Sequence, residues 1–256
     1  MEIIIGLLII AVGAFCQSSC YVPINKIKNW SWESYWIVQG VFAWLVFPFL
    51  GALLAVPDGH SLFEVYAAHP ADTLWAMFFG VLWGVGGLTF GLSMRYLGVA
   101  LGQSISLGTC AGLGTILTPI FTGHMEELTM PVIVGVIVTL LGIGIIGYAG
   151  NMKSASLSEE EKKKAVKDFN FTKGIFVALL AGFMSACFSI GLGFGQSLCF
   201  PESAEVYKTL PATLMVTAGG FLTNMVYCFY QNAKNKTWSD YGKTSLYVNN
   251  ILFCAL

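Results

Sequence analysis

The residues of this chain that could do chemistry are uncharged, and they recur at helical spacing inside long apolar stretches. Gln17 and Tyr21 share one face of the first stretch, and Ser189 and Gln196 share one face of a later stretch. Amides and hydroxyls supply hydrogen-bond donors and acceptors, and aromatic rings supply flat apolar surface, which together suit a neutral sugar or polyol. The predicted substrate-binding residues are Gln17, Ser18, Tyr21, Trp83, Gln103, Ser106, Ser189 and Gln196.

Charged side chains are absent from the middle of every apolar stretch, so the usual sign of an ion or proton pathway is missing there. A dicarboxylate or nucleotide substrate would call for buried Arg or Lys. For each serine and glutamine the alternative role is a hydrogen bond to a neighbouring helix, and for Trp83 it is ordinary helix packing. Glu33 lies near Lys26 and Lys28, and it either forms an ion pair with them or carries a coupled proton.

The chain offers no metal-ligand spacing and no catalytic acid pair, His/Cys cluster or activated serine. We therefore expect no catalytic residues, no metal and no cofactor, with a proton gradient as the energy source. The seven cysteines all fall inside apolar stretches, and no disulfide framework is implied.

The composition identifies a lipid bilayer as the surroundings of these stretches. Apolar residues make up 56% of the 256 residues, charged residues only 11%, and the mean hydropathy is +0.72. A soluble domain carries about 25% charged residues. The composition excludes an ordinary soluble domain, a disordered chain, a coiled coil and a nucleic-acid-binding protein.

Seven apolar stretches have the length of about 20 residues that a helix needs to cross about 30 Å of hydrocarbon. An eighth begins near Leu246 and stops at Leu256. The predicted fold is an all-α membrane protein, a transmembrane helix bundle. The seven stretches cover residues 3–22, 35–56, 73–93, 99–121, 131–149, 174–199 and 210–230.

Twelve of the thirteen basic residues fall in the first, third, fifth and seventh loops between these stretches, and Lys208 is the exception. Because basic residues accumulate in cytosolic loops, the odd-numbered loops are predicted to face the cytosol and the N-terminus to face outward.

An internal repeat is suggested by G-A-F-C-Q-S-S-C from Gly13 and G-F-M-S-A-C-F-S from Gly182. Five spans separate the two starts, so the copies would enter the membrane from opposite sides, as in the inverted repeats of many secondary transporters. Residues 1–150 would form the first five-helix repeat, 151–173 a cytosolic connector and 174–256 an incomplete second repeat. Since two such repeats need ten spans, we expect the sequence to be a fragment that lacks roughly three spans.

Two segments, Y-V-P-I-N-K-I-K-N-W-S-W-E (Tyr21–Glu33) and L-W-G-V-G-G-L-T-F-G-L-S-M-R-Y-L-G (Leu82–Gly98), resemble the L-rhamnose/proton symporter family of the drug/metabolite transporter superfamily. The resemblance implies ten spans, an outward N-terminus and proton-driven sugar uptake across the bacterial inner membrane. Another deoxysugar or polyol would fit the same residues. The resemblance continues through G-T-I-L-T-P-I (Gly114–Ile120), D-F-N-F-T-K-G (Asp168–Gly174) and L-P-A-T-L-M-V-T-A-G-G-F-L-T-N (Leu210–Asn224).

The leading hypothesis is therefore a symporter that takes up L-rhamnose or a related neutral sugar with protons by alternating access. A transporter of another small neutral metabolite in the same superfamily is the first alternative. A seven-span receptor is permitted by the span count alone, but the internal repeat and the start of an eighth span argue against it.

Overall fold

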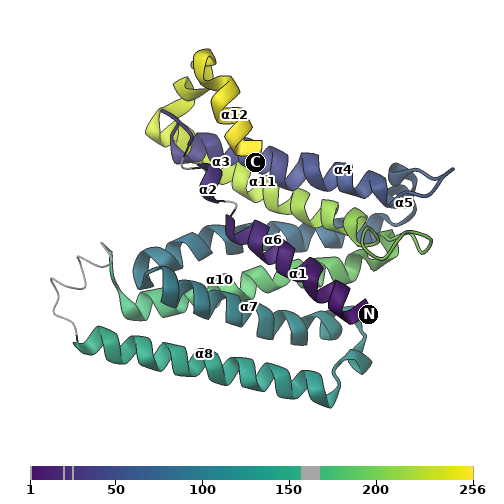
Figure 1. Cartoon of the computed structure of the whole chain (residues 1–256), viewed down its shortest axis with the longest axis horizontal. Helices are drawn as coiled ribbons and strands as arrows, with labels where there is room; N and C mark the ends of the chain where they lie inside the picture. Colours follow the sequence, from purple (N-terminus) through teal and green to yellow (C-terminus); the bar gives the residue numbers. More distant parts are fainter. Residues whose placement is uncertain (1, 20, 25, 157–167, 256) are drawn as a thin grey trace. The chain divides into compact units, whose positions relative to one another are not determined.

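The computed structural model describes residues 2–19, 21–24, 26–156 and 168–255, and all regular secondary structure in these ranges is helical (Figure 1). The predicted all-α class is therefore confirmed. Short 3-10 helices and one π-helix interrupt or join the longer α-helices.

Six helical segments of the described ranges are long and apolar enough to cross a membrane, and each overlaps a predicted span. The predicted first span corresponds to α1 (Glu2–Ser19), but the strongly apolar part of α1, Ile4–Cys16, is shorter than the six candidate spans. The predicted eighth span corresponds to α12 (Tyr247–Ala255). Six candidate spans are thus supported, and the counts of seven and eight stay predictions. The six are Trp32–Leu54, Pro70–Leu97, Ala100–Thr122, Met130–Lys153, Phe171–Leu198 and Leu210–Asn235.

The chain divides into two compact units. One unit is formed by residues 1–43 together with 225–256, and the other by residues 44–224. The first unit therefore combines segments from both ends of the sequence.

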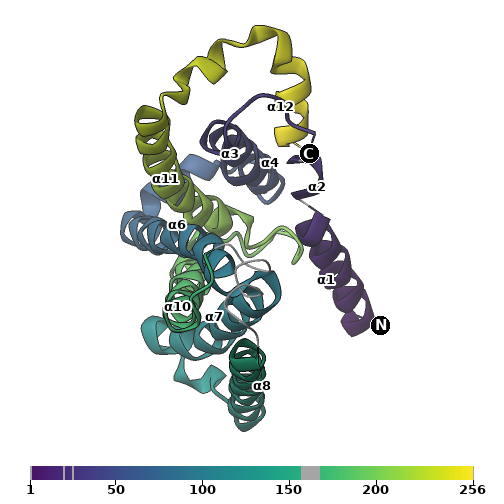
Figure 2. The same ribbon diagram turned by 90° about the vertical axis from the view of Figure 1, so that its left-hand side faces the viewer.

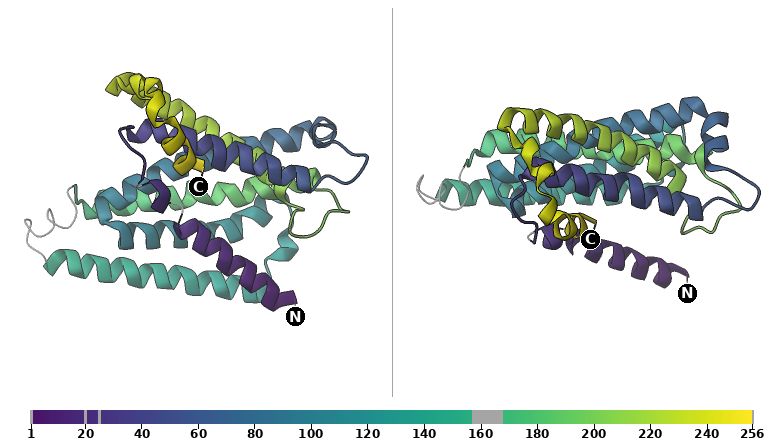
Figure 3. Two further views of the ribbon diagram at one scale, coloured as in Figure 1. Left: turned by 45° about the horizontal axis from the view of Figure 1, so that its top comes forward. Right: turned by 90° about the horizontal axis from the view of Figure 1, so that it is seen from above.

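Four long helices form most of the 44–224 unit: α6 (Pro70–Leu97), α7 (Val99–Thr122), α8 (Met130–Ser156) and α10 (Phe171–Phe194). Helix α10 packs against both α6 and α7, and α8 packs on α7 (Figure 2). Figure 3 shows α7 and α8 running lengthwise beside each other. The short η3 (Gly195–Leu198) continues α10, and α11 (Leu210–Asn235) also packs on α6 through its first half.

Small residues allow these helices to approach closely, as is common inside membranes. A Cβ atom on Gly86 of α6 would lie 2.8 Å from the backbone nitrogen of Ser185 on α10. A Cβ atom on Gly80 of α6 would overlap the carbonyl of Val216 on α11. The glycines at these positions therefore permit backbone contact between helices.

Local signals set the ends of the helices that carry candidate site residues. Helix α6 starts with Pro70, whose missing N–H is not needed in a first turn, and stops at Gly98, which has a φ of 82° that only glycine adopts easily. Helix α10 starts after Asn170, whose side chain accepts a hydrogen bond from the backbone N–H of Lys173 at 3.0 Å.

In the other unit, α12 packs against α3 (Trp32–Gly40) and α2 (Tyr21–Ile24), and η4 (Thr237–Gly242) packs against α3. The amide of Asn250 on α12 accepts a hydrogen bond from the backbone N–H of Lys28 at 3.0 Å and donates one to the Lys28 carbonyl at 2.8 Å. A buried asparagine thus fixes the chain before α3 to the last helix.

The candidate span Trp32–Leu54 contains a π-helix of six residues, η1 (Val41–Val46), between α3 and α4 (Phe47–Leu54). Pro48 has no N–H and cannot form the usual hydrogen bond to the carbonyl four residues earlier, which favours a local departure from α geometry. Such π segments are frequent at functional sites, which directs attention to the residues beside this one.

Candidate functional site

Trp83 lies in an aromatic group within the 44–224 unit. Its ring centroid is 5.0 Å from that of Phe188 on α10 with an interplanar angle of 60°, and 6.1 Å from that of Trp44 at 77°. One turn along α6, a Cβ atom on Gly87 would meet nothing within 4 Å. There is thus open space at Gly87, one turn from the indole, and an aromatic ring beside open space is a surface on which a sugar ring can rest.

Ser106 of α7 is buried, with an exposed fraction of 1%, and its hydroxyl lies 3.2 Å from that of Ser93 on α6. Its backbone carbonyl closely approaches Gly182 of α10. In this structure Ser106 therefore joins helices, which is the alternative role considered for the serines.

The other predicted polar residues of this unit are exposed. Gln103 lies on α7, Ser189 on α10 close to Gly114 of α7, and Gln196 on η3. Next to Gln196, the hydroxyl of Ser197 donates a hydrogen bond to Asp72 at 2.6 Å. Among the described residues, no hydrogen bond joins Trp83, Gln103, Ser106, Ser189 and Gln196 to one another.

The side chains of three further predicted residues, Gln17, Ser18 and Tyr21, lie outside the described part of the structure. Their role in sugar binding stays a prediction.

Gln39 is a candidate that the sequence reasoning missed. It is the second-to-last residue of α3, two positions before the π-helix, and its side-chain oxygen is buried without a hydrogen-bond partner among the described residues. A buried unpaired amide oxygen is rare in folded proteins and is a natural acceptor for a ligand hydroxyl. The rule that selected Gln17 and Gln103, a glutamine inside an apolar stretch, would also have found it.

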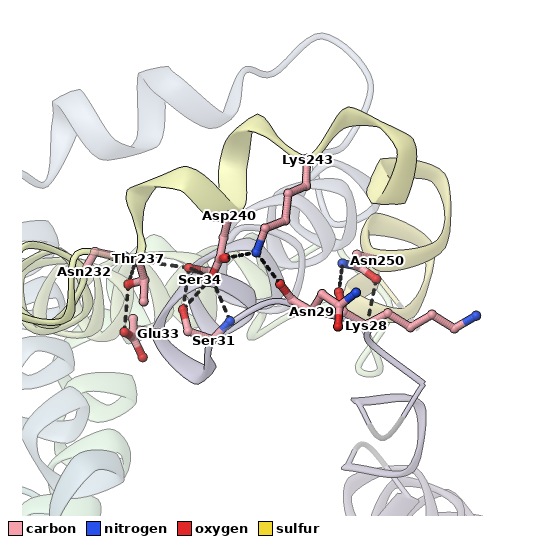
Figure 4. Close-up of polar contacts among 10 residues, drawn as sticks. All are labelled: Lys28, Asn29, Ser31, Glu33, Ser34, Asn232, Thr237, Asp240, Lys243 and Asn250. Atoms are coloured by element: carbon pink, nitrogen blue, oxygen red, sulfur yellow. Dashed lines mark hydrogen bonds and ion pairs between the residues drawn. The ribbon is translucent and has the colours of Figure 1, made fainter.

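A second group of polar residues, which we call the carboxylate cluster, brings the start of α3 together with the end of α11 and the segment that follows it (Figure 4). Its members come from sequence positions about two hundred residues apart, and several are almost completely buried. Glu33 and Asp240 are the two buried carboxylates among the described residues, each 5% exposed. The cluster consists of Ser31, Glu33, Ser34, Asn232, Asn235, Thr237, Asp240 and Lys243.

Glu33 is bound by neutral donors. One carboxylate oxygen, Oε1, accepts hydrogen bonds from Asn235 Nδ2 at 2.9 Å and from Thr237 Oγ1 at 2.8 Å. In the described part of the chain no ion pair joins Glu33 to Lys26 or Lys28. The ion pair considered from the sequence is therefore not formed, because Glu33 faces the 235–237 segment instead.

Asp240 is bound differently, by a cation and several hydrogen bonds. Its Oδ1 accepts from Lys243 Nζ at 2.5 Å, and its Oδ2 accepts from the backbone N–H of Ser31 at 2.8 Å and the Ser31 hydroxyl at 2.7 Å. The Ser34 hydroxyl lies 3.1 Å from the same oxygen. Burial raises the pKa of the Asp240 carboxyl, but the hydrogen bonds from Lys243, Ser31 and Ser34 outweigh it and hold the pKa at about 2.

The two carboxylates therefore differ in their chemistry. Asp240 stays ionised at any physiological pH because a lysine and several donors stabilise its charge. Glu33 has no cation within ion-pair distance among the described residues, and a protonated Glu33 would leave no cation unpaired. Two acids in contrasting surroundings commonly take different roles.

Sequence reasoning singled out Glu33 but missed Asp240, Asn232 and Thr237. Asn232, Thr237 and Asp240 lie in the seventh loop between the predicted spans, and nothing in their own spacing predicts a contact with the segment 30–33. Ser31, which binds Asp240, does lie in the segment Tyr21–Glu33 that carries the family resemblance.

Among the described residues there is no group of three or more His, Cys, Asp or Glu side chains that could hold a metal ion.

Comparison with known proteins gives one consistent result. A family model described as L-rhamnose-proton symport protein (RhaT) matches residues 1–256. A protein named L-rhamnose-proton symporter from Yersinia pestis bv. Antiqua (strain Antiqua) is 33% identical over 268 aligned residues, which cover 99% of this chain and 76% of that relative. A protein of the same name from Yersinia pseudotuberculosis serotype O:1b (strain IP 31758) matches with the same identity and coverage. No solved structure matches the chain.

Proposed function

Because this chain belongs to the L-rhamnose-proton symporter family, we propose that it carries L-rhamnose across a membrane together with protons. The observation that carries the proposal is the family match over the whole chain, and six apolar helices of membrane-crossing length agree with it. The chain is a membrane transporter and not an enzyme, and the receptor alternative no longer stands.

We propose that the sugar binds to the uncharged residues selected from the sequence: Gln17, Ser18, Tyr21, Trp83, Gln103, Ser106, Ser189 and Gln196. A hexose with hydroxyl groups and a methyl group needs donors, acceptors and apolar surface, and these residue types supply all three. Gln39 is a further candidate, because a sugar hydroxyl would give its buried oxygen the hydrogen bond that it lacks among the described residues.

For the proton, we propose Glu33 as the carrying residue. It is buried, its two donors are neutral, and no lysine or arginine in the part of the chain that the structure describes forms an ion pair with it. Asp240, the other buried carboxylate of the described residues, is held ionised by Lys243. A proton carrier must exist in both protonation states, and protonation of Glu33 would leave no charge unpaired on either of its two donors.

The remaining parts of the proposal concern the placement of the chain in the membrane. The distribution of basic residues supports an outward N-terminus and cytosolic odd-numbered loops, and the family supports the bacterial inner membrane. The repeat that begins at Gly13 and Gly182 supports five-helix repeats of opposite orientation that alternate between outward-open and inward-open states.

The test is uptake of labelled L-rhamnose into vesicles that contain the purified chain. We expect an inward proton gradient to drive accumulation, an uncoupler to abolish it, and Glu33→Gln to retain sugar exchange while losing the response to the gradient. Uptake that is unaffected by the uncoupler would refute the coupling. Proton-driven uptake of another labelled neutral sugar, with no uptake of labelled L-rhamnose, would favour the alternative, a transporter of a different small neutral metabolite.

A further inference from the structure

The backbone of residues 26–28, in the loop before α3, is held by two side chains of the last helix. The Lys26 carbonyl accepts a hydrogen bond from Asn249 Nδ2 at 3.1 Å, and the Asn250 amide binds both the N–H and the carbonyl of Lys28, at 3.0 Å and 2.8 Å. Asn250 is completely buried, with an exposed fraction of 0%. We call these three hydrogen bonds the clasp. The clasp uses only backbone atoms of the two lysines, so it leaves their ammonium groups for other partners.

The two clasped lysines and a second pair of lysines are exposed. Lys26 and Lys28 lie at the surface, and Figure 4 shows the Lys28 side chain pointing away from the carboxylate cluster. Lys234 lies in the last turn of α11 and Lys236 directly after that helix, and both are exposed as well. Within the described ranges, none of these four lysines forms an ion pair.

Few acidic groups compensate the charge of these lysines. The first loop (23–34) and the seventh loop (231–245) contain five lysines and two carboxylates. Both carboxylates, Glu33 and Asp240, are buried and already accept hydrogen bonds from protein donors. The fifth lysine, Lys243, is the one that pairs with Asp240. Because the carboxylate cluster joins the two loops, the four exposed lysines lie at the same end of the unit formed by residues 1–43 and 225–256.

Exposed aromatic side chains accompany the lysines at this end. Trp32 follows the first pair and is 39% exposed, and Trp238 follows the second pair and is 48% exposed. Tyr230, one turn before Lys234, is 61% exposed. Indole and phenol rings prefer the headgroup level of a membrane, where one part of the ring meets acyl chains and the other meets water. Lysines and aromatic rings at the ends of apolar helices therefore match the headgroup layer of a bilayer better than a soluble acidic partner.

We propose that Lys26, Lys28, Lys234 and Lys236 bind the phosphate groups of anionic phospholipids, and that the clasp holds the first two lysines in place for this. An ammonium group carries three donors for phosphate oxygens, and each lysine near an anionic membrane surface strengthens binding about fivefold. Phosphatidylcholine has the same phosphate, but its choline cation cancels the charge. The surface therefore prefers a lipid with net negative charge, such as phosphatidylglycerol. The inference rests on the proposed function only in placing the chain in a bilayer.

The test is native mass spectrometry of the full chain in a neutral detergent, titrated in turn with phosphatidylglycerol and with phosphatidylcholine. The spectra resolve chains with and without bound lipid and give a Kd for the first bound molecule. We expect phosphatidylglycerol to bind at least about tenfold more tightly than phosphatidylcholine. Its Kd should rise about twentyfold in the double variant Lys26→Gln/Lys28→Gln, and by a similar factor in Lys234→Gln/Lys236→Gln, while the Kd for phosphatidylcholine stays unchanged.

Two further variants separate this site from a general effect of charge. Lys208→Gln removes the same charge from a lysine that pairs with Glu205 at 3.1 Å, and it should leave the Kd for phosphatidylglycerol within about twofold of its original value. Asn250→Leu removes two hydrogen bonds of the clasp without changing any charge. We expect it to weaken phosphatidylglycerol binding severalfold, with circular dichroism reporting that the helices remain folded.

Equal Kd values for the two lipids in the unmodified chain would overturn the inference, and so would a loss of affinity in Lys208→Gln as large as in Lys26→Gln/Lys28→Gln. Displacement of phosphatidylglycerol by millimolar inorganic phosphate would indicate a site for free anions instead of lipid. An unchanged Kd in folded Asn250→Leu would overturn the role of the clasp. Absence of proton-driven L-rhamnose uptake would refute the proposed function, while the lipid titration would still decide this inference.

Discussion

Replacing Asp240 with asparagine removes the charge that holds η4 against the start of α3, and it leaves the size of the side chain almost unchanged. The carboxylate accepts from Lys243 and from the backbone and hydroxyl of Ser31, and it is close to the Ser34 hydroxyl. An asparagine can accept through only one of its two terminal atoms and carries no charge for Lys243.

The expected loss of folding free energy follows from the shift in the pKa of Asp240 between the unfolded and the folded chain. Its surroundings lower the pKa of the carboxyl from 3.8 to about 2. The difference corresponds to about 2.5 kcal/mol of folding free energy. Removing one partner of a fully buried pair can cost about 3 to 5 kcal/mol, but the Lys243 side chain is 40% exposed and can regain water, so the smaller figure applies.

Thermal unfolding of the purified chain in detergent measures this loss. At about 2 to 4 °C per kcal/mol for a chain of this size, Asp240→Asn should lower Tm by about 5 to 10 °C near neutral pH. Because the folded pKa lies below the unfolded one, the stabilisation is present above about pH 4 and disappears as the pH falls from about 4 to about 2. The difference in Tm between the two proteins should shrink over this range.

The matched control is Glu205→Gln. Glu205 forms an ion pair with Lys208 at 3.1 Å, but its side chain is 84% exposed, and such surface pairs contribute at most about 1 kcal/mol. Equal Tm values for Asp240→Asn and Glu205→Gln at neutral pH would refute the reasoning. A Tm difference between Asp240→Asn and the unmodified chain that does not change between pH 5 and pH 2.5 would show that the charge is not its source.

Three further predictions can be checked with the same preparations. Gly80→Ala should lower Tm, because the new methyl group overlaps a carbonyl of α11 and such overpacking costs about 1 to 3 kcal/mol, whereas Gly87→Ala, which meets no neighbour, should leave Tm unchanged or raise it. Gln39→Leu should weaken L-rhamnose binding about fivefold or more in a binding assay if its unpaired oxygen accepts a sugar hydroxyl, without lowering Tm. Arg95→Gln, which removes an exposed pair with Asp168, should change Tm by less than about 4 °C, and the change should vanish in high salt.

The membrane helices were largely predictable because hydrophobicity is summed over about twenty residues and tolerates local exceptions. The span predicted at 73–93 is Pro70–Leu97 in the structure, and the span predicted at 131–149 is Met130–Lys153. The ends moved outward because polar residues such as Asp72 and Arg95 still fit the first and last turns of a helix, where their charges favour its dipole. Hydropathy gave no means of finding the π-helix inside Trp32–Leu54.

The candidate site was predictable only in part, since residue type can be recognised in a sequence but the partner of a side chain often cannot. Glu33 was selected because it lies close to Lys26 and Lys28 at the end of a predicted span, yet its partners Asn235 and Thr237 lie about two hundred residues away. The nearby lysines suggested an ion pair by proximity in sequence, which the fold does not form. Ser106 shows the reverse case: a hydroxyl suited to a sugar is used, in this structure, between two helices.

The placement of α8 has a consequence for how its sequence can change during evolution. It packs mainly on α7, and only 6% of the residues in its most apolar window are buried. In the bilayer that the proposed function requires, most of its side chains would meet lipid tails, which distinguish apolar from polar groups but not one apolar shape from another. On that face natural selection would act on hydrophobicity alone, so Leu, Ile, Val and Phe should replace one another freely. At Gly80 or Ser34, in contrast, even a small change of the side chain would disturb close contacts with neighbouring atoms.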